Sequence, residues 1–130
     1  MKDYKQYFIL HAEPADVYMA LTHPQSIEIW TNEPATMSTE AGSEFSIMGG
    51  AIEGRNLEFV ENNKIVQEWY FGDETEHPSI VTLKLHPHNK GTSVELRHTN
   101  IPDEAYDNII EGWQEVYFAN LSIFLNDDTE

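Results

Sequence analysis

The chain has 130 residues, of which 40% are hydrophobic and 12% aromatic, a composition typical of a single packed domain spanning residues 1–130. It contains no cysteine, which excludes disulfides and thiolate metal sites. Seven Lys and Arg stand against 23 Asp and Glu, and the resulting net charge of −16 disfavours nucleic acid and anionic membrane surfaces as partners.

The first third of the chain is expected to form one strand and two short helices. The strand covers residues 4–10. Pro14 suits the first position of a helix, and Val17 and Leu21 give that helix an apolar side. His23-Pro24 interrupts it, and a second short helix is expected over residues 25–30.

Between residues 35 and 99 the sequence indicates strands and turns. Turn residues divide this part into six expected strands, at residues 35–36, 44–48, 51–60, 64–71, 79–85 and 92–99. Gly54 lies inside one of them and suggests a bulge or a sharp bend. Residues 72–78 are expected to form an acidic loop.

A long helix is expected to begin after Ile101-Pro102 and to end near Leu125. Large apolar residues recur in it every three or four positions and therefore share one face: Tyr106, Ile110, Trp113, Tyr117, Leu121 and Phe124. The outer face is acidic, and no Lys or Arg follows Arg97. Because like charges do not support a helix, burial of the apolar face must stabilise it.

Alternation along the strands indicates which side chains point toward this helix. The inward sets are Phe45 and Ile47, then Val81, Leu83 and Leu85, then Val94, Leu96 and His98. In the strand at residues 64–71 either of the two alternating sets of side chains could point inward. We favour the set that contains Trp69.

An ordered series of short motifs is similar to a known family. The motifs are Gly42-x-x-Phe45, Gly50-x-x-x-Gly54, Ile65-Val66-x-x-Trp69, Val81-Thr82-Leu83, Gly91-Thr92, Ile101-Pro102, Gly112-Trp113 and Tyr117-Phe118. In this order the series covers nearly the whole chain and resembles the C-terminal domain of the activator of heat-shock-protein-90 ATPase family, a START-like domain of the SRPBCC superfamily. The resemblance implies an α+β helix-grip fold, in which a curved seven-stranded antiparallel sheet surrounds a long C-terminal helix and two short helices follow the first strand.

The resemblance also implies two roles. The superfamily tends to hold an apolar small molecule between sheet and helix. Activation of a chaperone ATPase is the second implied role, and in the two-domain activators a separate N-terminal domain makes much of the chaperone contact. This chain is expected to begin directly at the START-like domain, as the family's single-domain bacterial relatives do.

The residues themselves also suggest a cavity beneath the long helix. Gly112 lies within that helix, where glycine is less favourable than alanine by about 1 kcal/mol, so close packing or room for a ligand should offset the loss. We favour close packing. The candidate lining residues are Trp30, Phe45, Trp69, Leu83, Leu96, His98, Trp113 and Tyr117, and the alternative is that they only fill the core.

His98 is the candidate polar contact of this cavity. It could bond to a ligand or titrate near neutrality, and the alternatives are that it caps a backbone group or pairs with a carboxylate. Glu58 and Glu68 are acid–base candidates only if they are buried. His86-Pro87-His88 offers two imidazoles but lacks the third or fourth ligand that zinc needs.

No catalytic glycine–serine motif, phosphate-binding glycine loop or metalloprotease motif is present in the sequence, so we expect no metal and no cofactor. The leading hypothesis is a non-enzymatic protein that binds a small apolar or aromatic molecule. The alternatives are a chaperone-associated ATPase-activating module and a cyclase- or hydratase-like enzyme that uses an inward His98. No stretch is long enough for a signal peptide or a membrane span, so we expect a cytoplasmic protein, as a monomer or a homodimer.

Overall fold

The computed structural model describes residues 1–71 and 74–126. Helices precede and follow a central run of strands. The elements are β1 (Lys2–Leu10), α1 (Pro14–Thr22), α2 (Pro24–Thr31), β2 (Glu44–Ile47), η1 (Met48–Gly50), β3 (Ile52–Val60), β4 (Lys64–Phe71), β5 (Glu74–His88), β6 (Gly91–Ile101), η2 (Asp103–Ala105), α3 (Tyr106–Gly112), η3 (Trp113–Tyr117) and α4 (Phe118–Leu125).

The strands form one antiparallel sheet in the order β1-β6-β5-β4-β3-β2. The described residues contain six strands, so the expectation of seven is wrong. Thr36 makes only an isolated bridge with Ser46, through two backbone hydrogen bonds of 2.8 and 3.0 Å. Pro34, which precedes this bridge, has no N–H to donate to a ladder, and the segment does not extend into a strand.

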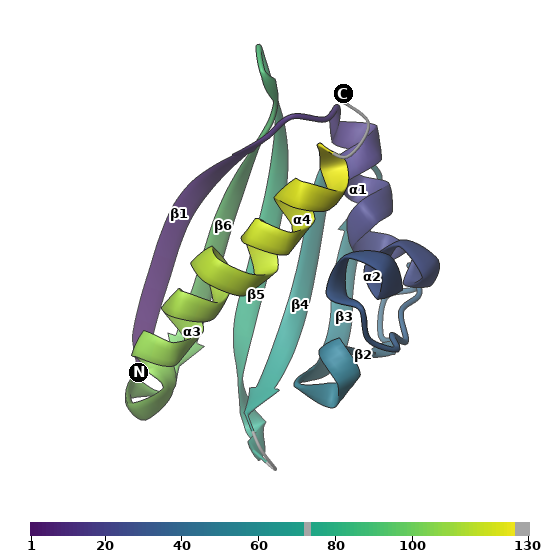
Figure 1. Cartoon of the computed structure of the whole chain (residues 1–130). Coiled ribbons are helices and arrows are strands. Elements are labelled where there is room, and N and C mark those ends of the chain that lie inside the picture. The colour runs from purple at the N-terminus through teal and green to yellow at the C-terminus, as the bar shows by residue number, and fades with distance from the viewer. Residues whose placement is uncertain (72–73, 127–130) are drawn as a thin grey trace.

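All helices cover one face of the sheet (Figure 1). The continuous helix formed by α3, η3 and α4 crosses the face in front of β6, β5 and β4, whereas α1 and α2 lie beside β3 and β2. An ion pair of 3.0 Å between the Met1 amine and Asp103 fixes the start of β1 beside the start of this helix. No helix in the described part of the chain is long and apolar enough to cross a membrane.

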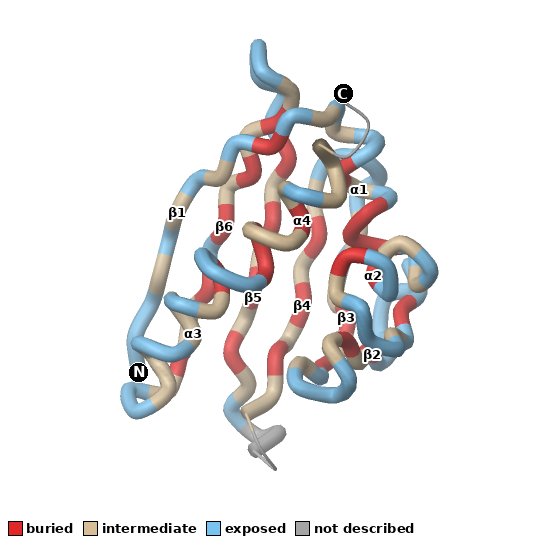
Figure 2. The backbone as a smooth tube through the Cα atoms, in the orientation of Figure 1, coloured by how far each residue is buried: buried red, intermediate tan, exposed pale blue. Residues whose placement is uncertain are grey.

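The core lies between the sheet and these helices, and buried residues alternate along the central strands (Figure 2). The inward sets predicted for β2, β5 and β6 are confirmed, since all of their members are buried. In β4 the set containing Trp69 is also the inward one, because Ile65 and Gln67 are buried with it. The alternating pattern of the sequence therefore predicted the packing face of these four strands correctly.

Gly54 is required by a close approach of two strands. A Cβ at this position would lie 1.7 Å from the carbonyl oxygen of Glu68 in β4. The bulge in this ladder lies between Asn56 and Glu58, so the expectation of a bulge at Gly54 is wrong by two residues. Steric contact with the neighbouring backbone, not a change of register, explains the glycine.

The connection between β4 and β5 is shorter than expected. Phe71 of β4 pairs with Glu74 of β5, so the part of the predicted acidic loop from residue 74 to residue 78 is strand, and residues 72–73 lie outside the described residues. The strands also extend toward residues 89–90, where β5 and β6 meet in a tight turn. Ladder pairing with one neighbour at each end, β4 at Glu74 and β6 at His86, Pro87 and His88, accompanies the extension of β5 through polar residues that resemble a loop.

The long helix has the predicted extent but contains a π-helical turn at Trp113–Tyr117. A π turn places an additional residue in the helical repeat. Tyr117 and Phe118 are therefore both buried, and Phe118 stacks on Phe8 of β1 with ring centroids 3.9 Å apart. A regular spacing of three or four residues could not predict that Phe118 belongs to the buried face.

Candidate functional site

A cavity of about 320 Å³ opens between the long helix and one end of the sheet. One wall comes from α3 and η3, and the other comes from η1 and the adjoining ends of β3 and β4. The lining residues are Met48, Ala51, Ile52, Trp69, Tyr70, Phe71, Asn108, Ile109, Gly112, Trp113, Val116 and Tyr117. Apolar and aromatic side chains predominate, as in most sites for small molecules.

Three of the eight residues predicted to line a cavity do so, namely Trp69, Trp113 and Tyr117. The other five are buried but do not belong to its lining: Trp30, Phe45, Leu83, Leu96 and His98. Leu83 and Leu96 face each other in the ladder between β5 and β6 and fill the core. The eight residues therefore do not all lie around one cavity: three border it, and the other five, from α2, β2, β5 and β6, are buried elsewhere.

The lining residues that the sequence reasoning missed lie partly at the ends of elements and partly along the long helix. Met48 and Ala51 flank a glycine pair in which Gly49 and Gly50 both have positive φ, so the chain turns there and forms a wall. On the helix, Ile109 and Val116 lie beside the predicted apolar stripe. Their spacing of seven residues was a usable signal, because it places them on one helix face.

Gly112 borders open space. Apart from the neighbouring backbone of its own helix, a Cβ at this position would have no described atom within 4 Å, so the expectation that Gly112 permits close packing of helix on sheet is wrong. The residue has ordinary helical backbone angles, with φ −62° and ψ −41°. Its missing side chain leaves room in the cavity instead.

Two stacked indoles form the floor between helix and sheet. The rings of Trp69 and Trp113 have centroids 4.8 Å apart and planes inclined by 21°. The Trp113 Nε1–H donates to Nδ1 of His98 at 3.0 Å, and the Trp69 Nε1–H donates to Oε1 of Gln67 at 2.9 Å. Both indole donors are thus directed to protein acceptors, and each ring is held in one orientation.

His98 is neutral and has a defined tautomer. Because an indole can only donate, Nδ1 must accept from Trp113, and the ring proton lies on Nε2, which donates to the Ser79 hydroxyl at 2.9 Å. That hydroxyl donates to the carbonyl of Trp69 at 3.1 Å. Burial lowers the pKa of His98 to about 4. The partners of His98 are a serine and a tryptophan. The two alternatives predicted from the sequence, pairing with a carboxylate and capping of a backbone group, are therefore both wrong.

A second chain of hydrogen bonds continues from the Trp69 indole through buried amides. Gln67 Nε2 donates to Oδ1 of Asn56 at 2.9 Å, and Asn56 Nδ2 donates to Oγ of Ser43 at 3.1 Å. Ser43 in turn donates to the carbonyl of Glu40 at 2.6 Å. Asn56 is fully buried and Gln67 nearly so. Satisfied buried amides of this kind fix side-chain geometry, and here they hold Trp69 at the cavity.

Tyr117 supplies an unused polar group. The residue lines the cavity and is only 6% exposed, and its hydroxyl has no hydrogen-bond partner among the described residues. Burial raises the pKa of Tyr117 above its ordinary value, so the group is a neutral hydroxyl at neutral pH. Trp30 packs edge-on behind the ring at 5.1 Å. A hydroxyl held in this way can donate or accept one hydrogen bond from a bound molecule.

The remaining polar candidates lie away from the cavity. Glu58 and Glu68 are not buried, so the condition for acid–base candidates is not met. His88 Nδ1 accepts from the backbone N–H of Lys90 at 3.0 Å, and His86 pairs with Glu95. Over residues 1–71 and 74–126, no group of three His, Asp or Glu is arranged to hold a metal ion.

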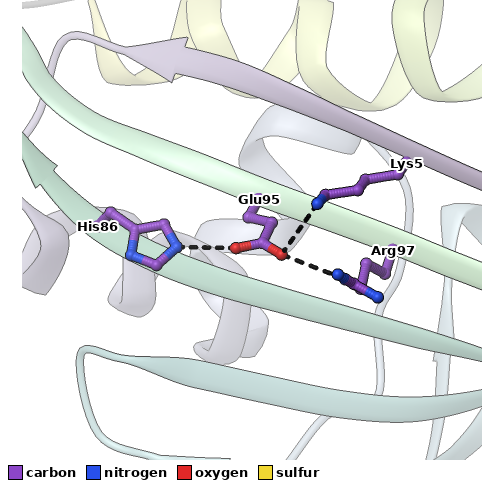
Figure 3. A network of polar contacts seen from close by, with 4 residues as sticks. All are labelled: Lys5, His86, Glu95 and Arg97. Atoms are coloured by element: carbon purple, nitrogen blue, oxygen red, sulfur yellow. Dashed lines mark hydrogen bonds and ion pairs between the residues drawn. The ribbon is translucent and has the colours of Figure 1, made fainter.

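Glu95 is the centre of a charge network on the opposite face of the sheet (Figure 3). Its carboxylate lies 3.0 Å from His86 Nε2, 3.2 Å from Arg97 Nε and 4.0 Å from Lys5 Nζ. The hydrogen bond from His86 is the main cause that lowers the pKa of Glu95. The network joins β1, β5 and β6 and has no contact with the cavity lining.

The sequence matches the family described as "Activator of Hsp90 ATPase homolog 1-like protein" over residues 11–126. Among curated relatives, the human "Activator of 90 kDa heat shock protein ATPase homolog 1" is 27% identical over 83% of this chain, and a homologue from Dictyostelium discoideum is 31% identical over 78%. The matched regions make up 32% and 27% of those proteins, so this chain matches only about a third of their length.

The fold is also found in a crystal structure described as an HSP90 activator from Plasmodium falciparum. The two structures superpose with a TM-score of 0.86 and 23% sequence identity, covering 95% of this chain and 96% of the other. At this identity the likeness shows the fold alone. It agrees with the arrangement described above, in which an antiparallel sheet packs against a C-terminal helix.

Proposed function

The chain belongs to the family of activator of Hsp90 ATPase homolog 1-like proteins, and on that premise we propose that it binds a small apolar or aromatic molecule in the cavity beneath the long helix. The observation that carries the proposal is the open space above Gly112, bordered by the two stacked indoles. Binding without catalysis is the role proposed.

The size and lining of the cavity support this role. Its volume of about 320 Å³ is within the usual range for small-molecule sites, which is roughly 300–1,000 Å³. Apolar walls would provide most of the binding free energy through burial of the ligand. The free Tyr117 hydroxyl would orient the ligand through one hydrogen bond.

The arrangement of His98 is the reason to propose binding rather than a cyclase- or hydratase-like reaction. Both ring nitrogens of His98 are used by Ser79 and Trp113, and the residue does not reach the cavity lining. A general acid or base must approach the reacting atom within hydrogen-bond distance. His98 is therefore assigned the task of holding Trp113 in place.

A binding screen with two substitutions at one position tests the proposal. Thermal unfolding is followed with a library of lipids and aromatic metabolites, since a molecule that binds only the folded state raises Tm. Gly112→Leu should fill the open space and abolish the shift, whereas Gly112→Ala should retain it because a methyl group occupies little of the cavity. If no molecule stabilises the wild type at saturating concentration, the proposal fails.

A second candidate function is that of a chaperone-associated module. It is supported by the names of the relatives, which are activators of the 90 kDa heat-shock-protein ATPase. The measurement is the ATPase rate of that chaperone with an excess of this protein. Stimulation would support the role, and an unchanged rate would discard it. Both candidate functions assume a cytoplasmic protein.

A further inference from the structure

Five aromatic residues contribute to the lining of the cavity: Trp69, Tyr70, Phe71, Trp113 and Tyr117. Because the two indole N–H groups are already bonded to His98 and Gln67, the indoles can offer a ligand only their ring atoms. Aromatic π systems attract cations, and tryptophan does so most strongly. Among the described residues, the lining includes no Lys or Arg that would oppose a cation.

The helix that forms one wall of the cavity is acidic. Asp107, Glu111 and Glu115 are exposed, each directly precedes a lining residue in the sequence, and none of them has an ion-pair partner among the described residues. On the other wall, the Glu33 carboxylate lies against Gly49 of η1. Acidic groups around a partly enclosed, low-dielectric site raise the local concentration of cations.

A basic residue near the lining, Arg55, is already paired with a carboxylate. Arg55 lies next to Tyr70. Its guanidinium is 3.6 Å from the Glu44 carboxylate and donates to the carbonyl of Gly42 at 2.9 Å. The ion pair leaves the acidic groups of the helical wall unopposed at the cavity.

We propose that the ligand of this cavity is an organic cation, a molecule in which an ammonium group, most simply a quaternary one, adjoins an aromatic or apolar body. The inference rests on the proposed function and adds the charge of the ligand to it. The π systems and the acidic wall both favour a positive charge. A quaternary ammonium needs no hydrogen-bond acceptor, so it suits a lining that is mostly apolar. The Tyr117 hydroxyl bonds to a polar group elsewhere on the ligand.

Two isosteric probes separate the charge of a ligand from its shape. The cation (3-hydroxyphenyl)trimethylammonium and the neutral 3-tert-butylphenol differ in one central atom, nitrogen or carbon. Affinities of both are measured by tryptophan fluorescence and by calorimetry on the full chain. We expect the cation to bind about tenfold more tightly or better, with an affinity that falls as salt is added.

Each outcome of this comparison decides something. Equal affinities, or tighter binding of the neutral probe, would overturn the cation inference and leave the proposed function standing. If neither probe binds, and no neutral molecule from the library binds, both the inference and the proposed function fail. Tighter binding of the cation that is lost in Gly112→Leu supports both.

A matched pair of variants then tests the acidic wall. The cavity variant combines Asp107→Asn, Glu111→Gln and Glu115→Gln. The control combines Glu13→Gln, Asp16→Asn and Glu40→Gln, which change the net charge equally but do not adjoin any lining residue. We expect the cavity variant to weaken cation binding several-fold with unchanged affinity for the neutral probe. Equal weakening by both variants would show a general effect of net charge and overturn the role given to the wall.

Discussion

Trp113 donates its indole N–H to Nδ1 of His98 across 3.0 Å, and this one bond fixes both a buried histidine and an aromatic wall of the cavity. His98 is fully buried, so an unpaired ring nitrogen there would be unfavourable. Ser79 satisfies the other nitrogen at 2.9 Å. The hydrogen bond thus links β6 to the long helix beside the cavity that the Trp113 indole lines.

The bond predicts a histidine that does not titrate near neutrality. The ring nitrogen signals of His98 in NMR should stay constant from pH 8 to pH 5, with Nδ1 unprotonated and Nε2 protonated, because the pKa is lowered to about 4. A titration midpoint near 6.5 would contradict the hydrogen-bond assignment.

Stability should depend on pH through the same residue. The pKa of His98 is about 4 in the folded state and 6.5 in a free histidine, so only the unfolded chain takes up this proton between those values. Above about pH 6.5 the neutral His98 makes its full contribution to the free energy of unfolding. This contribution decreases by roughly 3 kcal/mol as the pH falls toward 4. The measurement is denaturant unfolding of the wild type and of His98→Gln at each pH. The carboxylates affect both proteins equally, so their effect cancels in the difference between the two free energies of unfolding. A difference that does not change with pH would contradict the prediction.

Ser79→Ala should destabilise the fold by roughly 1–3 kcal/mol, since it leaves the Nε2–H of His98 buried without an acceptor. The measurement is urea unfolding. Ser93→Ala on β6 is the matched control, because Ser93 points to the opposite face and its side chain has no hydrogen-bond partner among the described residues. We expect the control to change stability by less than about 0.5 kcal/mol. Similar losses in both variants would refute the assigned role of Ser79.

Gly112→Ala should stabilise the protein by about 1 kcal/mol, because alanine is the better helix former and its methyl group meets open space. Gly54→Ala is the opposite case. Its Cβ would collide with the carbonyl of Glu68, and we expect a strong loss of stability or no folding. Both effects are measured by urea unfolding, and a destabilised Gly112→Ala protein would show that the space above Gly112 is filled.

The network around Glu95 should contribute modestly to stability. Glu95→Gln is expected to lower the free energy of unfolding by at most about 1 kcal/mol, and less so in high salt, because the partly exposed side chains of Lys5, His86 and Arg97 surround this carboxylate. Glu58→Gln, which removes a single ion pair of 3.0 Å with Lys64, should have a smaller effect. An effect of Glu95→Gln that is insensitive to salt would contradict an electrostatic origin.

Regular patterns in the sequence predicted much of the fold. Strand alternation placed Leu96 and His98 inward, and helical spacing placed Trp113 and Tyr117 on the buried face, because burial on one face imposes those periods. The same periods could not predict that a π turn brings Phe118 inward as well.

The cavity itself depended on contacts that no local pattern encodes. The partners of His98 come from β5 and from the helix, so its neutral state could be derived only after the elements were packed. Met48 and Ala51 line the cavity because a turn with positive φ at Gly49 redirects the chain after β2. Sequence reasoning therefore found the aromatic floor, through Trp69 and Trp113, but not the opposite wall.

The most direct test of ligand binding in this cavity uses the three tryptophan indole N–H signals in NMR. With the cationic or the neutral probe, the signals of Trp69 and Trp113 should shift together with one Kd. Trp30, which donates to the Ala20 carbonyl outside the lining, should shift least. Gly112→Leu should abolish the shifts. Absence of any shift at millimolar probe, or shifts largest at Trp30, would contradict the account.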